Sequence, residues 1–141
     1  MAAPPVPDAV TEALARYPGP VRARLLDVRA LIFAVAEETP GVGPLTETLK
    51  WGEPAYLTEA SRSGSTIRLG AVRSAPEAGA VLLNCKTSLI AEFRDQFADC
   101  LTFDGTRAIV LPQSGPLPRE PLEICLRAAL TYHRRKGVAE R

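Results

Sequence analysis

Few residues in this sequence belong to the kinds that build metal sites or nucleophilic active sites. The 141 residues include one histidine, His133, and three widely spaced cysteines, Cys85, Cys100 and Cys125. No Cys-x-x-Cys pair occurs, so a zinc site of cysteine and histidine at the usual spacing is excluded. An odd number of cysteines does not suit a disulfide framework, and each cysteine lies among apolar residues. We therefore expect three buried, unreactive thiols.

Catalytic motifs are equally scarce. A Ser/His/Asp or Cys/His arrangement would need His133 as its base. That histidine continues an apolar stripe with Leu130 at helical spacing, so a histidine packed in the core or at its edge is the simpler interpretation. The Gly-x-Ser-x-Gly, Gly-x-Gly-x-x-Gly and phosphate-loop patterns do not occur. Acid–base catalysis by a pair of carboxylates is still possible, because Glu47, Glu53 and Glu59 are close in sequence.

The chain also lacks a strong net charge and long apolar runs. Its formal net charge of +1 provides no field that would recruit nucleic acid or an acidic membrane surface. No apolar run approaches the length of a membrane span, and residues 1–7 lack the basic and apolar regions of a signal peptide. We expect a cytoplasmic protein whose partners include neither nucleic acid nor membrane.

What the sequence does contain is the composition of an ordinary globular domain. Hydrophobic residues make up 46% of the chain and charged residues 23%, and a chain of this length can bury a core of its own. We expect residues 1–19 to form an N-terminal extension with a short helix capped by Asp8. Residues 20–137 should then form a single domain.

Hydrophobic periodicity predicts the elements of that domain. Leu25, Val28, Ile32 and Val35 have the spacing of a core-facing stripe, which predicts a helix over about 20–39. Alternation and turn signals predict strands at 45–57, 66–73, 80–85, 101–103 and 108–111, and a last helix from near 121. The Asp104-Gly105 pair is the best hairpin signal. The order predicts an α+β fold: an antiparallel sheet of four to six strands, with the N- and C-terminal helices packed on one face.

The only tryptophan, Trp51, lies in the stretch that organises these predictions. A glycine and a proline flank Glu53 directly after it, and both residue types mark bulges or strand edges. We expect a bulge or bend there, which turns Glu53 outward and makes Lys50, Glu53 and Tyr56 one exposed cluster. In the alternative interpretation Trp51 anchors the core, as a sole tryptophan in a small domain usually does.

Three cations are expected on or beside neighbouring strands. If the strands of Lys50, Arg68 and Lys86 are adjacent, these side chains converge near Tyr56 and Trp51 on a site for a small carboxylate or phosphate. The alternative is that all three are solvated on the open face of the sheet. The candidate ligand-binding residues are Lys50, Trp51, Glu53, Tyr56, Arg68 and Lys86.

The string Lys50-Trp51-Gly52-Glu53-Pro54-Ala55-Tyr56, after a helix that holds Arg29-Ala30-Leu31-Ile32, resembles the domain of unknown function 1801, the YdhG-like family of small bacterial proteins. The resemblance covers about residues 20–136 and includes the Arg68-Leu69 strand, the Lys86 turn and the Asp104-Gly105 hairpin. That family is similar in fold to frataxin, in which two helices cover one face of an antiparallel sheet. The resemblance therefore implies a frataxin-like fold.

Some members of the family are described as iron chaperones, so the resemblance also implies iron as a possible cargo. In frataxin-like proteins the iron ligands are carboxylates on the first helix and the adjoining strand edge. The corresponding helix here contains several arginines, and its only paired acids are Glu37 and Glu38. These two glutamates are the weak candidates for metal ligands, and no other cofactor is expected.

Three classes of function follow from these observations. The first is a non-catalytic binding or accessory protein for a small anionic ligand or a protein partner. The second is a frataxin-like intracellular iron chaperone, and the third is an enzyme of unknown class. The sheet face that the helices leave uncovered could also be buried in a symmetric homodimer.

Overall fold

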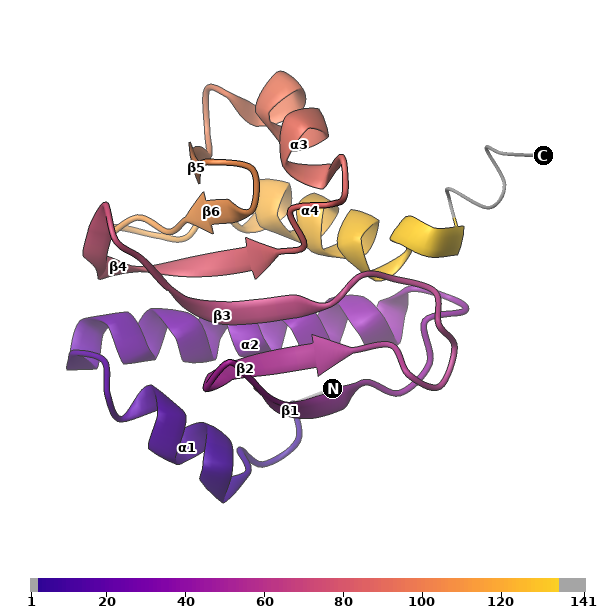
Figure 1. Cartoon of the computed structure of the whole chain (residues 1–141), viewed down its shortest axis with the longest axis horizontal. Helices are drawn as coiled ribbons and strands as arrows, with labels where there is room; N and C mark the ends of the chain where they lie inside the picture. Colours follow the sequence, from indigo (N-terminus) through magenta and orange to yellow (C-terminus); the bar gives the residue numbers. More distant parts are fainter. Residues whose placement is uncertain (1–2, 135–141) are drawn as a thin grey trace.

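A six-stranded antiparallel sheet forms the centre of the structure, a computed structural model that describes residues 3–134. The strands are β1 (Thr46–Lys50), β2 (Glu53–Leu57), β3 (Ile67–Val72), β4 (Ala75–Leu83), β5 (Thr102–Asp104) and β6 (Ala108–Val110). They lie in the order β1-β2-β3-β4-β6-β5, and every neighbouring pair is antiparallel (Figure 1). The predicted α+β class and antiparallel sheet are confirmed.

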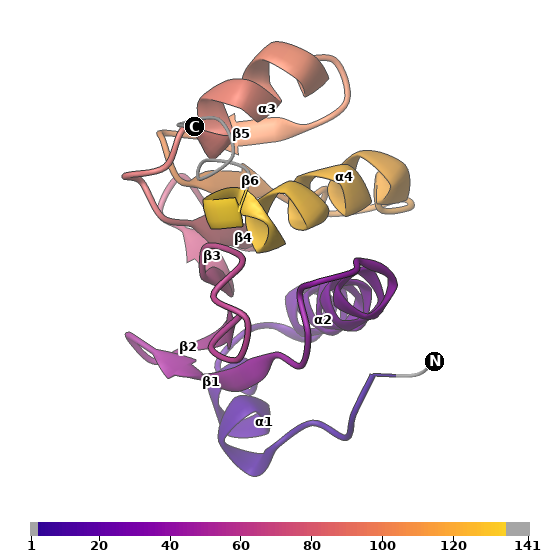
Figure 2. The ribbon, with the colours of Figure 1, turned by 90° about the vertical axis from the view of Figure 1, so that its right-hand side faces the viewer.

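Two of the four helices cover one face of this sheet. The helices are α1 (Asp8–Leu14), α2 (Gly19–Glu38), α3 (Leu89–Phe97) and α4 (Arg119–Leu130). Figure 2 shows α2 and α4 next to each other on the same side of the sheet, as predicted. The shorter α1 packs against β1 and β2, and α3 packs against α4. Within residues 3–134, no helix combines the length and the apolar character that a membrane crossing requires.

The core lies between the sheet and the pair α2 and α4. The predicted stripe on α2, which comprises Leu25, Val28, Ile32 and Val35, is fully buried. Each such side chain contributes roughly 1.5–3 kcal/mol by leaving water. One residue of α2 departs from the pattern: Arg29, which the periodicity places off the stripe, is also buried. Its burial is explained by an ion pair with a strand, described below.

The end of α4 is completed by the loop between β2 and β3. The Ser65 backbone N–H donates to the carbonyl of Ala129 at 2.8 Å, and the Ser63 hydroxyl donates to the carbonyl of Leu130 at 2.7 Å. The last carbonyls of a helix have no partner within the helix. Here a loop that is distant in sequence supplies two of the missing donors.

The bulge or bend predicted at residues 52–54 is a two-residue hairpin turn at Trp51 and Gly52, so the strand is broken there but not by a bulge. Lys50 pairs with Glu53 across the turn, and the two turn residues, Trp51 and Gly52, have φ angles of 55° and 75°. Positive φ at both positions is the geometry of the tight turn that matches the twist of two antiparallel strands. Glycine adopts it readily, whereas a bulky residue does so at a cost.

Trp51 lies at the tip of this hairpin and is 90% exposed. The interpretation that it anchors the core is therefore wrong. The Arg16 guanidinium, just beyond α1, donates to the carbonyl of Gly52 and ties the turn to the N-terminal helix. Arg16 thus holds the backbone of the hairpin turn in place, while the Trp51 indole remains in solvent.

Several local predictions also need correction. Asp8 does not cap α1, which begins at Asp8 itself after Pro7 and has no side-chain cap. The predicted turn over residues 74–79 is shorter, because Val72 already pairs with Ala75 and only Arg73 and Ser74 lie between them. β4 therefore begins earlier than predicted, with an irregular register before Ala80.

The predicted burial of single side chains is also wrong at three positions, Cys85, Cys100 and His133. Cys85 and Cys100 are exposed thiols, and only Cys125 is buried, where burial raises the pKa of its thiol to about 12. His133, predicted to pack, is exposed, with its ring at an edge-on contact to Tyr132. Apolar neighbours in sequence did not imply burial here, because the two exposed cysteines lie in turns beside β4 and α3.

Candidate functional site

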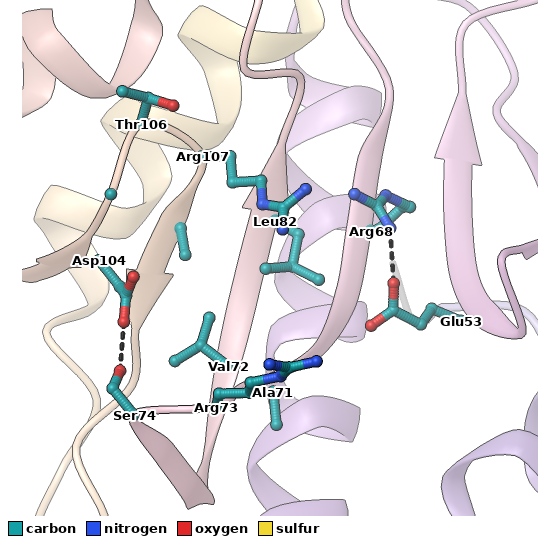
Figure 3. A pocket seen from close by; sticks show the side chains of 12 residues that line it. Glu53, Arg68, Ala71, Val72, Arg73, Ser74, Leu82, Asp104, Thr106 and Arg107 are labelled. Atoms are coloured by element: carbon teal, nitrogen blue, oxygen red, sulfur yellow. Dashed lines mark hydrogen bonds and ion pairs between the residues drawn. The ribbon is translucent and has the colours of Figure 1, made fainter.

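A groove of about 710 Å³ lies on the face of the sheet that is turned away from α2 and α4 (Figure 3). We call it the open-face groove. It spans β3 and β4, with the start of β2 at one side and the β5–β6 turn at the other. Strand pairing brings its central residues together, because Arg68 pairs with Leu82 and Leu82 pairs with Ala108. Residues directly opposite each other on paired strands share a face of the sheet.

The floor of the groove is apolar and separate from the main core. Ala80, Leu82 and Ala108 form a small buried cluster of their own, and Val72 packs against it. These side chains face away from α2 and α4, so the long side chains around the groove shield them from water. Arginine can cover apolar surface with its stem while its charged end stays in solvent.

The rim of the groove carries three arginines and two acids. Arg68 and Glu53 form an ion pair at 2.6 Å, with side chains 20% and 18% exposed. Opposite them, Asp104 accepts a hydrogen bond from the Ser74 hydroxyl. Figure 3 shows the guanidinium groups of Arg68 and Arg107 directed toward each other above Leu82.

The remaining two arginines are available to a ligand. Arg73, in the turn between β3 and β4, and Arg107, in the turn between β5 and β6, are both exposed. Their guanidinium groups make no hydrogen bond and no ion pair with any residue between 3 and 134. A guanidinium offers a planar fork of donors that matches a carboxylate or a phosphate. The groove therefore presents unused anion-binding groups above an apolar floor.

The carboxylate of Glu53 occupies a space that a glycine provides. One oxygen accepts from Arg68, and the other lies directly over Gly70 of β3. A methyl group at position 70 would collide with that oxygen. Partial burial raises the pKa of Glu53, and the charges of Arg68, Arg107 and Arg16 oppose this rise.

The structure brings together only part of the predicted cation cluster. Arg68 and Glu53 line the open-face groove, whereas Lys50 and Lys86 are exposed residues outside its lining. Strand pairing places Lys50 toward the Val72 end of β3 and Lys86 beyond its opposite end. The three cations therefore do not converge as predicted.

Tyr56, another predicted member of the exposed cluster, is fully buried on the helix-covered face. Its hydroxyl donates to the carboxylate of Glu47 at 2.8 Å. The same carboxylate accepts from Arg29 of α2 at 2.7 and 2.9 Å. Burial and the neighbouring carboxylate raise the pKa of Tyr56 far above its usual value, so its hydroxyl keeps its proton. Tyr56 is a structural residue here.

Arg29 closes this network from the helix side. Its guanidinium also donates to the carbonyl of Pro5 at 3.3 Å and lies 4.9 Å from the ring centre of Phe33. Phe33 in turn meets the Tyr56 ring edge-on. Because its hydrogen bond to the Glu47 carboxylate favours the charged form, the pKa of Arg29 is raised. The network fixes β1 and β2 to α2 and to the N-terminal segment.

Glu37 and Glu38, the candidate metal ligands, are exposed at the end of α2. Within residues 3–134, no group of three or more histidine, cysteine, aspartate or glutamate side chains lies close enough to hold a metal ion. Hard cations such as iron need several converging oxygens, and the open-face groove places its two carboxylates among arginines.

Sequence reasoning missed Arg73, Arg107 and the Ser74–Asp104 pair. Two signals could have found them: each arginine lies in a short turn between strands, and Asp104 belongs to the hairpin signal itself. What joins these turns is the pairing of β4 with β6, which no local pattern encodes. Comparisons of the chain with protein-family models, curated proteins and solved structures found no match.

Proposed function

We propose that this protein is a non-catalytic binding protein that holds a small organic anion in the open-face groove. The observation that supports the proposal is the surplus of guanidinium groups. Arg68, Arg73 and Arg107 face two acids, Glu53 and Asp104, and two of the three arginines have no partner among residues 3–134. Arginines that cannot pair internally can bind a carboxylate or phosphate at both of its oxygens.

The floor of the groove suggests what the rest of the ligand is like. Ala71 and Val72 are the partly exposed apolar residues of the groove lining, and Leu82 and Ala108 lie buried beneath the arginines. A ligand with one anionic group and a compact apolar body would contact both the arginines and the apolar residues of the groove. Small-molecule sites commonly combine an apolar surface with a few placed polar groups. Positive charge above an apolar floor meets these requirements, so binding is the activity that these residues support best.

The resemblance at residues 50–56 is the basis of a second proposal, that the chain is of the YdhG-like type with a frataxin-like fold and a cytoplasmic location. The packing of α2 and α4 on one face of an antiparallel sheet supports the proposed fold. A solved structure of a YdhG-like protein with a different strand order would contradict it.

Isothermal titration with two probes, inorganic sulfate and benzoate, tests the anion site at low ionic strength. We expect the wild type to bind at least one probe, and Arg73→Gln/Arg107→Gln to weaken binding at least about tenfold, because hydrogen bonds to charged groups are lost. Sulfate tests the charge alone, and benzoate adds an apolar body.

The matched control is Lys50→Gln/Lys86→Gln, which removes the same two charges outside the groove. This variant should bind like the wild type. If both double variants weaken binding equally, the attraction is a general charge effect and the groove is not the site. If the wild type binds neither probe, the proposed function is wrong.

A further inference from the structure

Arg68, on the rim of the open-face groove, already pairs with an anionic group, and that group belongs to the protein itself. Arg68 donates to Glu53 through Nη1, at 2.6 Å from Oε1. We infer that Glu53 is a resident competitor: its carboxylate occupies Arg68 in the free protein, and the anionic group of a ligand takes its place. This inference rests on the proposed function.

The contact between Glu53 and Arg68 has the character of an exchangeable one. Only one guanidinium nitrogen and one carboxylate oxygen are joined, so the pair uses half of the fork that a guanidinium offers. Both side chains retain contact with solvent, where an ion pair is worth little. A ligand that engages both Arg68 and Arg107 would make more charge-assisted contacts than Glu53 does alone.

A glycine in β3, Gly70, provides the space that the Glu53 carboxylate occupies. Gly70 leaves room for the second oxygen of Glu53 above β3, where any side chain would exclude it. That oxygen makes no hydrogen bond with residues 3–134. The carboxylate is thus held by the space above Gly70 and by one hydrogen bond from Arg68. Its release breaks that one hydrogen bond.

Charges from every neighbouring element face Glu53. Arg68 approaches from β3, Arg107 from the β5–β6 turn, and Arg16 from the segment after α1. Tyr17, beside Arg16, also interacts with Glu53 electrostatically. When Glu53 leaves Arg68, Arg16 remains as a nearby cation at the same end of β2, so the displaced carboxylate keeps a favourable neighbour.

Competition of this kind makes anion binding depend on pH. A protonated Glu53 no longer competes for Arg68, so affinity for an anion should rise as pH falls. Partial burial raises the pKa of Glu53, which brings this change closer to neutral pH. Sulfate is the suitable probe, because its charge stays constant over this range.

The experiment is a calorimetric titration of sulfate into the full chain at pH 7.5 and pH 5. At pH 7.5 we expect Glu53→Gln to bind sulfate about twofold to fivefold more tightly than the wild type, because the partly exposed ion pair it removes is of that strength. Arg68→Gln should lose most of the binding. As pH falls from 7.5 to 5, the affinity of the wild type should move toward that of Glu53→Gln, whose own affinity should barely change.

Asp104→Asn is the matched control, because it removes one negative charge from the same groove but away from Arg68. In about 0.15 M salt its gain in affinity should be less than about twofold, since a surface charge is screened within about 8 Å there. An equal gain in both variants would overturn the inference, because general electrostatics would explain it.

The remaining outcomes separate the inference from the proposed function. If Glu53→Gln binds sulfate no better than the wild type while Arg68→Gln loses binding, the groove is an anion site but Glu53 does not compete. If Glu53→Gln binds more weakly, Glu53 positions Arg68 and the inference is wrong. If no variant binds sulfate or benzoate at either pH, the proposed function itself fails. Thermal melts of each variant confirm that it is folded.

Discussion

The β1–β2 hairpin carries two glutamates, and each pairs with an arginine on a different face of the sheet. Glu47 binds Arg29 of α2 in a sealed setting, where the two side chains are 9% and 4% exposed. Glu53 binds Arg68 of β3 on the open face at the same kind of distance, but both groups reach solvent. The residue types are identical, so the difference between the two pairs comes from their surroundings.

The surroundings decide what each pair can do. The inner carboxylate accepts two bonds from Arg29 and one from Tyr56, so it is fully satisfied. Among residues 3–134, the outer carboxylate accepts one bond, and two guanidinium groups close by make no hydrogen bond or ion pair. A saturated network resists exchange because each broken bond leaves a buried charge. An unsaturated one in contact with water can exchange partners, which suits binding.

The largest expected effect comes from making the same substitution in both pairs. Arg29→Met should lower the free energy of unfolding by about 3–5 kcal/mol, because it leaves the Glu47 carboxylate buried without its cation. Arg68→Met should lower it by less than about 1 kcal/mol. Urea denaturation of both variants measures the difference.

A second variant checks the reason for the loss. Arg29→Met/Glu47→Leu replaces both charges with apolar side chains and should be more stable than Arg29→Met alone, since no unpaired charge remains. If Arg29→Met and Arg68→Met destabilise the protein equally, the contrast between the two faces is wrong.

The turn that joins the two glutamates offers the next largest effect. Trp51→Asn should raise the free energy of unfolding by about 1 kcal/mol, because asparagine tolerates positive φ better than a bulky residue. The indole buries almost nothing, so little packing is lost. Chemical denaturation checks the gain, and Lys50→Asn, next to the turn but outside it, should not produce it. A loss of stability in Trp51→Asn would show that the indole makes a contact that stabilises the hairpin.

The pH dependence of stability tests whether burial or the pairing with Arg68 dominates the ionisation of Glu53 on the open face. Because the folded-state pKa of Glu53 is raised, its contribution to stability is largest below the ordinary glutamate pKa and declines as pH rises through the raised value. The stability of the wild type relative to Glu53→Gln should therefore fall as pH rises above about 4, by less than about 1 kcal/mol. A difference that grows with pH would mean that the pairing with Arg68 outweighs burial.

The smallest stability effect is expected from Gly70→Ala. The added methyl meets only the flexible end of Glu53 and, less closely, Leu82, so stability should change by less than about 0.5 kcal/mol. The Glu53 carboxylate keeps its charge but must leave its seat above β3. Sulfate titration should then show tighter binding, as for Glu53→Gln. Unchanged binding in Gly70→Ala would mean that the position of Glu53 does not matter.

The sequence predicted the parts of the fold that repeat at short range. The stripe through Leu25 and Ile32 has helical period, and the helix and its buried face are confirmed. Alternation identified the strand of Arg68, which pairs with its neighbours as an inner strand of the sheet. These patterns succeed because burial of an amphipathic face depends on periodicity alone.

The parts that could not be predicted depend on partners far along the chain. Arg29 is a buried residue only because Glu47 and Tyr56 face it from the sheet. Trp51 occupies a turn position for which its residue type is unfavourable, so propensity pointed elsewhere. Arg107 reaches the open-face groove through the pairing of two strands, which no spacing reveals.

The loop that completes α4 makes the two halves of the chain open together. Its Ser63 side chain and the Leu130 carbonyl are 67 residues apart in sequence, so the helix terminus cannot fray independently of the loop between β2 and β3. Amide protons on both segments should exchange with deuterium at similar rates, as members of one cooperative unit. A substitution that loosens the end of α4 should then also loosen the β2–β3 loop, which joins the strands of Glu53 and Arg68.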